Sequence, residues 1–505
     1  MKKISKIVIP VVLSLLLLLG ILCYNSANWY LDVYGDLGFD AILYTLFSAM
    51  DNVESGLIED YIHTALIPAV IISTALSVFL FFPSKRRLVL NIGRYFRLRF
   101  YPLHRAVSVL VSLAIIVTLV STAAADVGLT AYIKNTLATR TSFIEENYVK
   151  PTQDNVKFPA QKQNLIYIYL ESMETTFLST DLGGGNDVNP IPELYALAEE
   201  NINFSHNSAV GGFEALSGSN WTVGAMVSAT AGVPLKTPFG IQGNSYGQDQ
   251  FMPGITSLSD VLHENGYYQA LMVGSDAGFG GRKQYYEQHG TDKIYDLFTA
   301  RQDGIVPEDY YVWWGMEDAR LFEYAKQELT KIAQNEQPFA FTMLTADTHH
   351  IGGYVCGDCS NDYAQQYENV LACSSKRVYA FIQWIQQQDF YENTTIILAG
   401  DHPTMDGEFI VTNIAEGYER KVYNCFINAK AQTDNTKNRQ FGPFDMFPTT
   451  LAALGCTIEG DRLGLGTNLF SETPTLCEQL GTGQFNMEVA RNSSFYNKEF
   501  LNIFM

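Results

Sequence analysis

Apolar residues gather in three long runs within the first 130 residues of the chain. The runs cover residues 5–24, 61–82 and 106–128. Each run approaches about 20 residues, which is the length of helix that crosses a hydrocarbon layer about 30 Å thick. The pattern therefore predicts three membrane-spanning helices that anchor the chain.

A cleaved signal peptide is the alternative interpretation of the first run. A lipoprotein signal would place a small residue just before its cysteine, but Leu22 precedes Cys23. The run also shows no clear small-x-small cleavage motif. We therefore favour a retained membrane anchor.

Beyond residue 160 the pattern changes to short apolar runs that are rich in β-branched and aromatic residues. These runs lie at 164–170, 267–274, 339–345, 394–399 and 421–428. Helix-like stretches lie between them, at 257–265, 317–335 and 374–388. Apolar strands that alternate with helices are typical of an α/β fold with a mostly parallel sheet flanked by helices.

The two patterns predict four parts of the chain. They are a transmembrane region at 1–128, a linker at 129–160, an α/β domain at 161–480 and a C-terminal tail at 481–505.

Charged residues make up only 17% of the chain, against roughly 25% in soluble proteins, which agrees with a membrane part. The aromatic content of 13% argues against disorder. The formal net charge of −20 argues against a nucleic-acid partner, which would favour a basic surface.

Flanking charges predict the orientation in the membrane. The loop at 25–60 carries seven acids and no Lys or Arg, whereas the loop at 83–105 carries seven bases and no acid. The N-terminus carries Lys2, Lys3 and Lys6. Because basic segments stay in the cytoplasm, we expect a cytoplasmic N-terminus and an extracytoplasmic domain after the third helix.

Six of the seven cysteines lie beyond residue 350. An extracytoplasmic domain can oxidise such residues. Cys356 and Cys359 form a C-x-x-C motif that Cys373 follows, a pattern that also suits zinc or redox chemistry. We favour a structural disulfide from Cys373 to one of the other two, and less strongly one from Cys456 to Cys477.

Polar residues follow two of the predicted strands at the point where each strand ends. Glu171 comes directly after the first strand, and Asp401 and His402 come after the fourth. Ligand sites in parallel sheets lie at the carboxyl ends of strands, and a mixed set of oxygen and nitrogen donors suits Mn²⁺ or Zn²⁺. These residues are therefore candidate metal ligands, although Asp401 as a helix cap beside a hydrogen-bonded His402 is the structural alternative.

A hydroxyl residue, Thr222, begins an apolar stretch that follows a turn rich in Gly, Ser and Asn. Such a loop leads into a helix N-terminus, where N–H groups and the helix dipole favour anions such as phosphate. Metal coordination lowers the pKa of a hydroxyl and makes it a nucleophile. The structural alternative is that Thr222 only caps the helix.

The motifs LIYIYLES, TADTHH, DAILYTL at 40–46 and GDRLGLGTNLF at 460–470 resemble a known family. It is the lipoteichoic acid synthase and phosphoglycerol transferase group, in the sulfatase-like branch of the alkaline phosphatase superfamily. The resemblance implies that Thr222 is the catalytic nucleophile. It also implies that Thr222 joins Glu171, Asp401 and His402 in binding one divalent cation, Mn²⁺ first, with Zn²⁺ or Mg²⁺ as alternatives.

Two further positions carry over by resemblance. Arg282 matches the phosphate-contacting arginine of the family, and its alternative is a surface arginine at a helix start. His349 matches the substrate-binding histidine, which also serves as a catalytic acid. His350 is the adjacent candidate, because Ile351 stands where the relatives have proline.

The resemblance implies a membrane phosphoglycerol transferase. Such an enzyme moves glycerophosphate from phosphatidylglycerol, through a phospho-threonine-type intermediate, to a cell-envelope glycan or glycerophosphate polymer. Phosphoethanolamine transfer, hydrolysis of a phosphodiester or sulfate ester, and a non-catalytic membrane-tethered scaffold are the alternatives. A true sulfatase would need a Cys/Ser-x-Pro-x-Arg motif, which the nearest string, residues 373–377, lacks.

Overall fold

The computed structural model describes residues 5–34, 38–39, 41–43, 55–81, 88–92, 96–100, 104–137, 140–236 and 250–502. Some residues used above lie outside these ranges, namely Lys2, Lys3, Lys85, Arg86, Arg87, Arg94, Asp36, Asp40, Asp51, Glu54 and residues 44–46. The chain divides into two compact units. One is Met1–Phe39 with Asp51–Lys134, and the other is Asp40–Met50 with Asn135–Met505.

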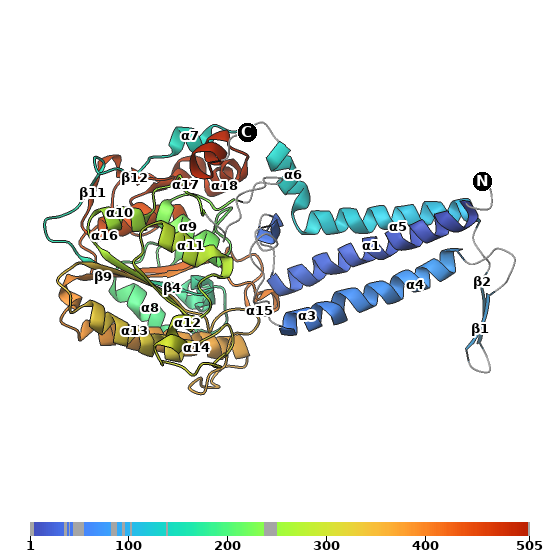
Figure 1. Ribbon diagram of the computed structural model, residues 1–505, viewed down its shortest axis with the longest axis horizontal. Coiled ribbons are helices and arrows are strands. Elements are labelled where there is room, and N and C mark those ends of the chain that lie inside the picture. The colour runs from blue at the N-terminus through green and yellow to red at the C-terminus, as the bar shows by residue number, and fades with distance from the viewer. Residues whose placement is uncertain are drawn as a thin grey trace. The chain divides into compact units, whose positions relative to one another are not determined.

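The first unit contains three helices that are long and apolar enough to cross a membrane. Their elements are α1 (Ser5–Tyr34), α3 (Ser55–Tyr61) continuing through a π-helical turn (Ile62–Leu66) into α4 (Ile67–Phe81), and α5 (Arg105–Asp126). Helix α1 packs against both α4 and α5 (Figure 1). Strands β1 (Leu88–Ile92) and β2 (Phe96–Phe100) form an antiparallel hairpin between α4 and α5.

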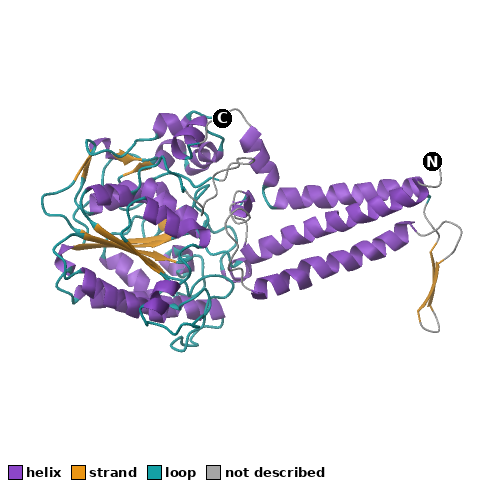
Figure 2. Ribbon diagram, viewed as in Figure 1, coloured by secondary structure: helices purple, strands orange, loops and turns teal. Residues whose placement is uncertain are grey.

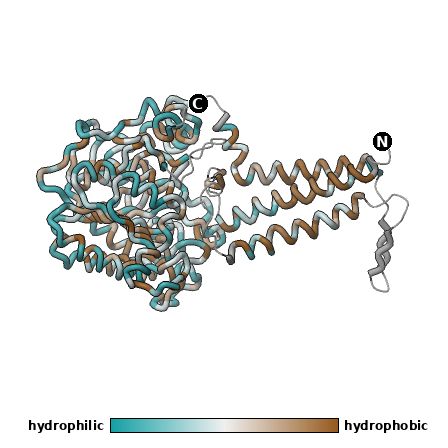
Figure 3. The backbone as a smooth tube through the Cα atoms, viewed as in Figure 1, coloured by the Kyte–Doolittle hydropathy of each residue, from teal (hydrophilic) through white to brown (hydrophobic). Residues whose placement is uncertain are grey.

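Hydrophobic residues predominate along these helices, as the brown colour of the backbone in Figure 3 shows. Ile7, Ile71 and Leu110 are 70%, 62% and 66% exposed. Water would make such exposure costly, whereas a hydrocarbon layer would not. The predicted three-helix anchor is therefore confirmed, and the chain is a membrane protein.

The second unit is built on a seven-stranded sheet with the order β5-β10-β9-β4-β8-β6-β7. The strands are β4 (Asn164–Leu170), β5 (Gly212–Phe213), β6 (Tyr268–Val273), β7 (Lys293–Tyr295), β8 (Phe339–Leu344), β9 (Thr394–Gly400) and β10 (Val422–Ile427). Strand β10 pairs antiparallel with both β5 and β9, and the other strand pairs of this sheet are parallel. Strands β4 and β9 are buried along their whole length, as apolar runs without alternation predict.

Helices cover both faces of this sheet (Figure 2). One face carries α8 (Pro192–Glu200), α12 (Leu297–Gln302), α13 (Asp318–Ile332) and α14 (Gln366–Gln386). The other carries α9 (Thr222–Ala231), α10 (Leu258–Glu264), α11 (Arg282–Gln288) and α16 (Met446–Ala453). The predicted mostly parallel α/β fold is therefore confirmed.

Helix α14 begins at Gln366, earlier than the predicted stretch at 374–388. Its first turns read QYENV, which looks polar, yet Tyr367, Glu368 and Asn369 are buried against neighbouring loops. Packing therefore extends the helix beyond the segment that its apolar pattern marks.

The segment at 129–160 contains α6 (Leu129–Leu137), α7 (Phe143–Asn147) and β3 (Val156–Lys157), which pairs with β11 (Thr457–Ile458). The tail contains α18 (Thr482–Ala490) and a π-helical turn (Tyr496–Phe500). The remaining elements of this unit are β12 (Arg462–Leu463), β13 (Gly466–Thr467), α15 (Gly407–Asn413) and α17 (Leu476–Leu480). In the tail, the Tyr496 hydroxyl donates to the Pro234 carbonyl at 2.8 Å, which ties the tail to the loop after α9.

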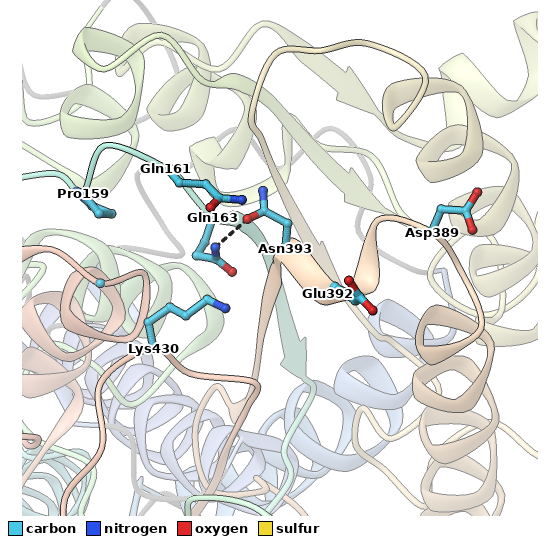
Figure 4. A pocket seen from close by; sticks show the side chains of 8 residues that line it. Pro159, Gln161, Gln163, Asp389, Glu392, Asn393 and Lys430 are labelled. Atoms are coloured by element: carbon cyan, nitrogen blue, oxygen red, sulfur yellow. Dashed lines mark hydrogen bonds between the residues drawn. The ribbon is translucent and has the colours of Figure 1, made fainter.

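A polar cavity of about 630 Å³ lies where β4 and β9 begin. It is lined by Pro159, Gln161, Gln163, Asp389, Glu392, Asn393, Lys430 and Gly455 (Figure 4). The Gln163 amide donates to Asn393 at 2.5 Å across one side of it. This is the edge opposite to the carboxyl ends of the strands, where ligand sites of parallel sheets lie.

Candidate active site and metal centre

The parallel register of β4 and β9 brings the candidate metal ligands together. Leu170 pairs with Gly400, so the residues that follow, Glu171 and Asp401, leave the sheet side by side. Atoms of Glu171, Asp401 and His402 that can ligate a metal all lie within 4.8 Å of one another. His402 Nε2 is 3.3 Å from Asp401 Oδ2 and 3.6 Å from Glu171 Oε1.

The donor atoms at this point fit a divalent cation. Asp401 Oδ1 accepts hydrogen bonds from the Ser172 and His402 N–H groups, each at 2.8 Å. Asp401 Oδ2 is buried and has no hydrogen-bond partner among the described residues. His402 Nδ1 lies 2.9 Å from the Pro403 carbonyl, so Nδ1 holds the proton and Nε2 keeps its lone pair for a ligand.

The electrostatics of the three-residue cluster also favour a bound cation. Burial first, and the neighbouring Asp401 carboxylate second, raise the pKa of Glu171 well above its usual value. Two buried carboxylates side by side are costly even with the positive charge of Arg282 acting on Glu171, and a bound cation would offset that cost. The arrangement therefore has the oxygen and nitrogen donors, and the excess negative charge, that Mn²⁺ or Zn²⁺ prefers.

Thr222 is brought to the same point from another element. It is the first residue of α9, and its Oγ1 lies 3.3 Å from His402 Nε2. Trp221 occupies the N-cap position of α9, so Thr222 is not the capping residue and the helix-cap alternative is wrong. The Thr222 hydroxyl instead lies beside His402, one of the three candidate ligands.

Arg282 begins α11 and is only 6% exposed, so the surface-arginine alternative is also wrong. Its guanidinium donates to the Ser275 hydroxyl at 2.9 Å and to the Asp276 carbonyl at 2.7 Å. Nε donates to the Phe279 carbonyl at 3.1 Å. Its positive charge acts on both Glu171 and His349. A held guanidinium of this kind suits a phosphoryl group.

His349 and His350 follow β8 and stack on each other, with ring centroids 4.3 Å apart. The Trp314 ring lies 4.6 Å from the His349 ring. Burial lowers the pKa of His349 to about 4, so its ring is neutral at pH 7. Because Nδ1 lies 2.9 Å from the His350 carbonyl and holds the proton, Nε2 is the nitrogen that accepts a proton.

Ser172 supports the candidate ligands, and the sequence patterns did not indicate it. Its hydroxyl donates to Glu171 Oε1 at 2.8 Å, and its N–H donates to Asp401. Its φ of 54° lies in the left-handed region, which is strained for serine and turns the N–H toward Asp401. A serine after a strand carries no periodic signal that marks this role.

A buried ion pair fixes the loop that follows His402. Glu174 is fully buried and accepts hydrogen bonds from both the Nε and Nη2 of Arg420. The same carboxylate accepts from the Thr404 N–H at 2.8 Å, and Arg420 Nη2 donates to the Thr404 carbonyl at 2.7 Å. The pair therefore holds both backbone groups of a residue two positions after His402.

Comparisons with known proteins identify relatives of this chain. A family model described as Sulfatase matches residues 163–456. Phosphoglycerol transferase I of Xanthomonas euvesicatoria is 30% identical over 320 residues, which cover 62% of this chain and 43% of that protein. Phosphoglycerol transferase I of Salmonella choleraesuis is 29% identical over 408 residues, which cover 78% and 48%. The chain thus spans about half the length of these relatives.

Among solved structures, the lipoteichoic acid synthase of Listeria monocytogenes superposes with a TM-score of 0.50 at 22% identity. The superposition covers 65% of this chain and 80% of that one. This likeness concerns the fold, and it supports the α/β architecture described above.

Metal binding should stabilise the protein through these ligands. We expect Mn²⁺ added to the chelator-treated full chain at about 100 times its dissociation constant to add about 2.7 kcal/mol to the free energy of unfolding. Asp401→Asn should abolish the rise in Tm, measured by differential scanning fluorimetry in detergent. Asp389→Asn, an exposed acid at the opposite edge of the sheet, is the control and should retain it. An undiminished shift in Asp401→Asn would contradict the site.

Breaking the Glu174–Arg420 pair should be costly because Arg420→Gln leaves the Glu174 carboxylate buried without its partner. We expect Arg420→Gln to lower the free energy of unfolding by about 3 kcal/mol, and Glu174→Gln with Arg420→Gln to lose less than the two single variants together. Denaturant unfolding of the full chain measures this. Glu287→Gln, which breaks an exposed pair with Lys283, should change stability by less than about 0.5 kcal/mol. Additive losses would show that the pair is not coupled.

Proposed function

The chain belongs to the sulfatase family, and we propose that it is a membrane-anchored phosphoglycerol transferase. The proposed reaction moves glycerophosphate from phosphatidylglycerol to a hydroxyl of a cell-envelope glycan or glycerophosphate polymer. One observation carries the proposal: the Thr222 hydroxyl lies 3.3 Å from His402 Nε2, and His402 belongs to the buried cluster with Glu171 and Asp401. The curated relatives named phosphoglycerol transferase I support the choice of transferred group.

We propose that Glu171, Thr222, Asp401 and His402 hold one divalent cation, with Mn²⁺ the first choice. When bound, the cation lowers the pKa of the threonine hydroxyl and offsets charge on the phosphoryl oxygens.

In the proposed first step Thr222 Oγ1 attacks the phosphorus of the lipid headgroup. The bond from phosphorus to the diacylglycerol oxygen breaks, and a glycerophosphoryl group is left on Thr222. Arg282 binds the phosphoryl oxygens, because its guanidinium is already held in place by the Ser275 hydroxyl and two carbonyls. Because the Arg282 guanidinium is held in place before the reaction, it loses little conformational entropy when negative charge develops on the phosphoryl oxygens.

In the proposed second step an acceptor hydroxyl displaces Thr222 from phosphorus. His349 is neutral at pH 7 and accepts the proton of that hydroxyl at Nε2. In the first step the Thr222 hydroxyl gives up its proton and the leaving diacylglycerol alkoxide takes one up, and His349 Nε2 carries that proton between them, as microscopic reversibility of the second step requires. Trp314 packs against the His349 ring and fixes its plane.

The membrane anchor keeps the catalytic domain close to its lipid substrate. A lipid donor stays in the membrane, so a tethered domain meets it at a high effective concentration. We propose that the N-terminus is cytoplasmic and the catalytic domain extracytoplasmic, from the acidic loop at 25–60 and the basic loop at 83–105.

The nucleophile and the donor can be tested together. We expect Thr222→Ala to lower turnover of a fluorescent phosphatidylglycerol on the order of 10³-fold, because the attacking oxygen is lost. Mass spectrometry of acid-quenched wild-type protein should find a glycerophosphoryl group on Thr222. Ser228→Ala, which removes a buried hydroxyl from the same helix, is the control. An adduct on another residue, or turnover only of phosphatidylethanolamine, would contradict the proposal.

Arg282 should matter for its shape as well as its charge. We expect Arg282→Lys to lower kcat/KM for phosphatidylglycerol about 10²-fold, because lysine lacks the planar pair of donors. Steady-state kinetics in mixed micelles measures this. Lys283→Gln, at the exposed neighbouring position, should leave kcat/KM unchanged. An equal loss of kcat/KM in both variants would contradict a phosphate-binding role for Arg282.

A further inference from the structure

Three cysteines form a compact thiol cluster away from the candidate active site. Cys356 and Cys359 lie in the loop between β8 and α14, and Cys373 lies on α14. Cys356 Sγ is 3.4 Å from Cys359 Sγ and 3.7 Å from Cys373 Sγ. All seven cysteines are described and are free thiols, so neither expected disulfide is formed in this structure. Cys356 is the sulfur that both of the others approach.

Arg377 lies beside this cluster, one turn after Cys373 on α14. Its Nη2 is 3.1 Å from Cys356 Sγ and 3.6 Å from Cys373 Sγ. Hydrogen bonds from the Cys359 thiol and from Arg377 lower the pKa of Cys373. The other charged groups that act on Arg377 and Cys373 are Asp358, Asp318 and Asp347. A guanidinium in this position stabilises a thiolate, which is the reactive form of cysteine.

We propose that Cys356, Cys359 and Cys373 form a thiol–disulfide exchange site in which Cys356 can pair with either of the other two. An odd number of thiols at one point leaves one of them free after any disulfide has formed. Cys359 and Cys373 are partly exposed, whereas Cys356 is buried. The two outer sulfurs are therefore the ones that an external disulfide reaches first.

The exchange balances with an external disulfide as the oxidant. The Cys373 thiolate attacks one sulfur of that disulfide, and the other sulfur leaves as a thiolate. The Cys356 thiol gives its proton to solvent, and its thiolate attacks the Cys373 sulfur of the mixed disulfide and releases the second external thiolate. Two protein thiols are oxidised, and one external disulfide is reduced to two thiols.

The remaining thiol can then move the bond within the protein. The Cys359 thiol gives its proton to solvent, and its thiolate attacks the Cys356 sulfur, forms a Cys356–Cys359 bond and releases the Cys373 thiolate. Arg377 lies where that leaving thiolate needs a positive charge. The turn in which the Cys359 N–H donates to the Cys356 carbonyl at 3.2 Å already brings the two residues of the C-x-x-C motif together.

A metal site is the competing interpretation of the same three sulfurs. A structural zinc ion takes four ligands, and the described cluster offers three, with no fourth histidine, cysteine or carboxylate in the group. Arg377 also places a positive charge on two of the three sulfurs, which opposes a cation. The geometry therefore favours disulfide exchange.

The test uses the full chain in detergent, equilibrated in glutathione buffers of varied redox poise. Alkylation under acid quench, followed by peptide mapping, gives the bonding of each cysteine. In oxidising buffer we expect one disulfide and one alkylated thiol among the three residues, with both Cys356–Cys373 and Cys356–Cys359 peptides present. Cys359→Ser should retain the first linkage and Cys373→Ser the second. Cys425→Ser, a buried thiol of β10, is the control and should change neither.

Three outcomes would overturn the proposal. They are full alkylation of all three thiols in oxidising buffer, a single linkage that does not re-form elsewhere in Cys359→Ser or Cys373→Ser, and stoichiometric zinc released by a thiol reagent.

A kinetic measurement adds an independent check on folded protein. We expect Arg377→Gln to slow alkylation of Cys373 at pH 7 about tenfold, and the exposed Arg320→Gln to leave it unchanged. Equal rates of Cys373 alkylation in the two variants would contradict the proposal that Arg377 stabilises the Cys373 thiolate.

Discussion

The parallel pairing of β4 with β9 is the constraint on which the candidate site depends. Each strand is buried on both faces along its length, so a shift of register by one residue would move every side chain to the opposite face, disrupt the packing there and be strongly disfavoured. The register fixes Leu170 opposite Gly400, and thereby sets two carboxylates side by side in the interior. The register therefore places two carboxylates where they repel each other, and a single bound cation would offset that repulsion.

Neighbouring groups keep this unfavourable arrangement in place. Ser172 contributes a hydroxyl and an N–H to the two carboxylates, at the cost of a left-handed backbone conformation. The Glu174–Arg420 pair holds the loop after His402. The Tyr367 hydroxyl lies within 2.9 Å of both the Thr348 carbonyl and the Thr404 hydroxyl, so it joins that loop to the one that carries His349. Strain and burial at the site are therefore offset by contacts that lie just outside it.

Much of this arrangement could be predicted from local sequence, because strands buried on both faces read as apolar runs and their ends carry the polar residues. The positions of Glu171, Asp401 and His402 followed from that rule. The contacts that support them did not, because Glu174 and Arg420 are 246 residues apart and neither belongs to a periodic pattern. The early start of α14 was also missed, since the burial of Glu368 and Asn369 depends on tertiary packing. The three apolar helices were the simplest part, because length and hydropathy alone define them.

The central claim is that one divalent cation is bound jointly by a threonine hydroxyl and three side chains from two strand ends. Anomalous diffraction at the manganese edge, from crystals of the full chain grown with Mn²⁺, tests it most directly. The account predicts one strong peak about 2.0–2.2 Å from ligand atoms of Glu171, Thr222, Asp401 and His402. A peak bound elsewhere, or none between these four side chains, would contradict it.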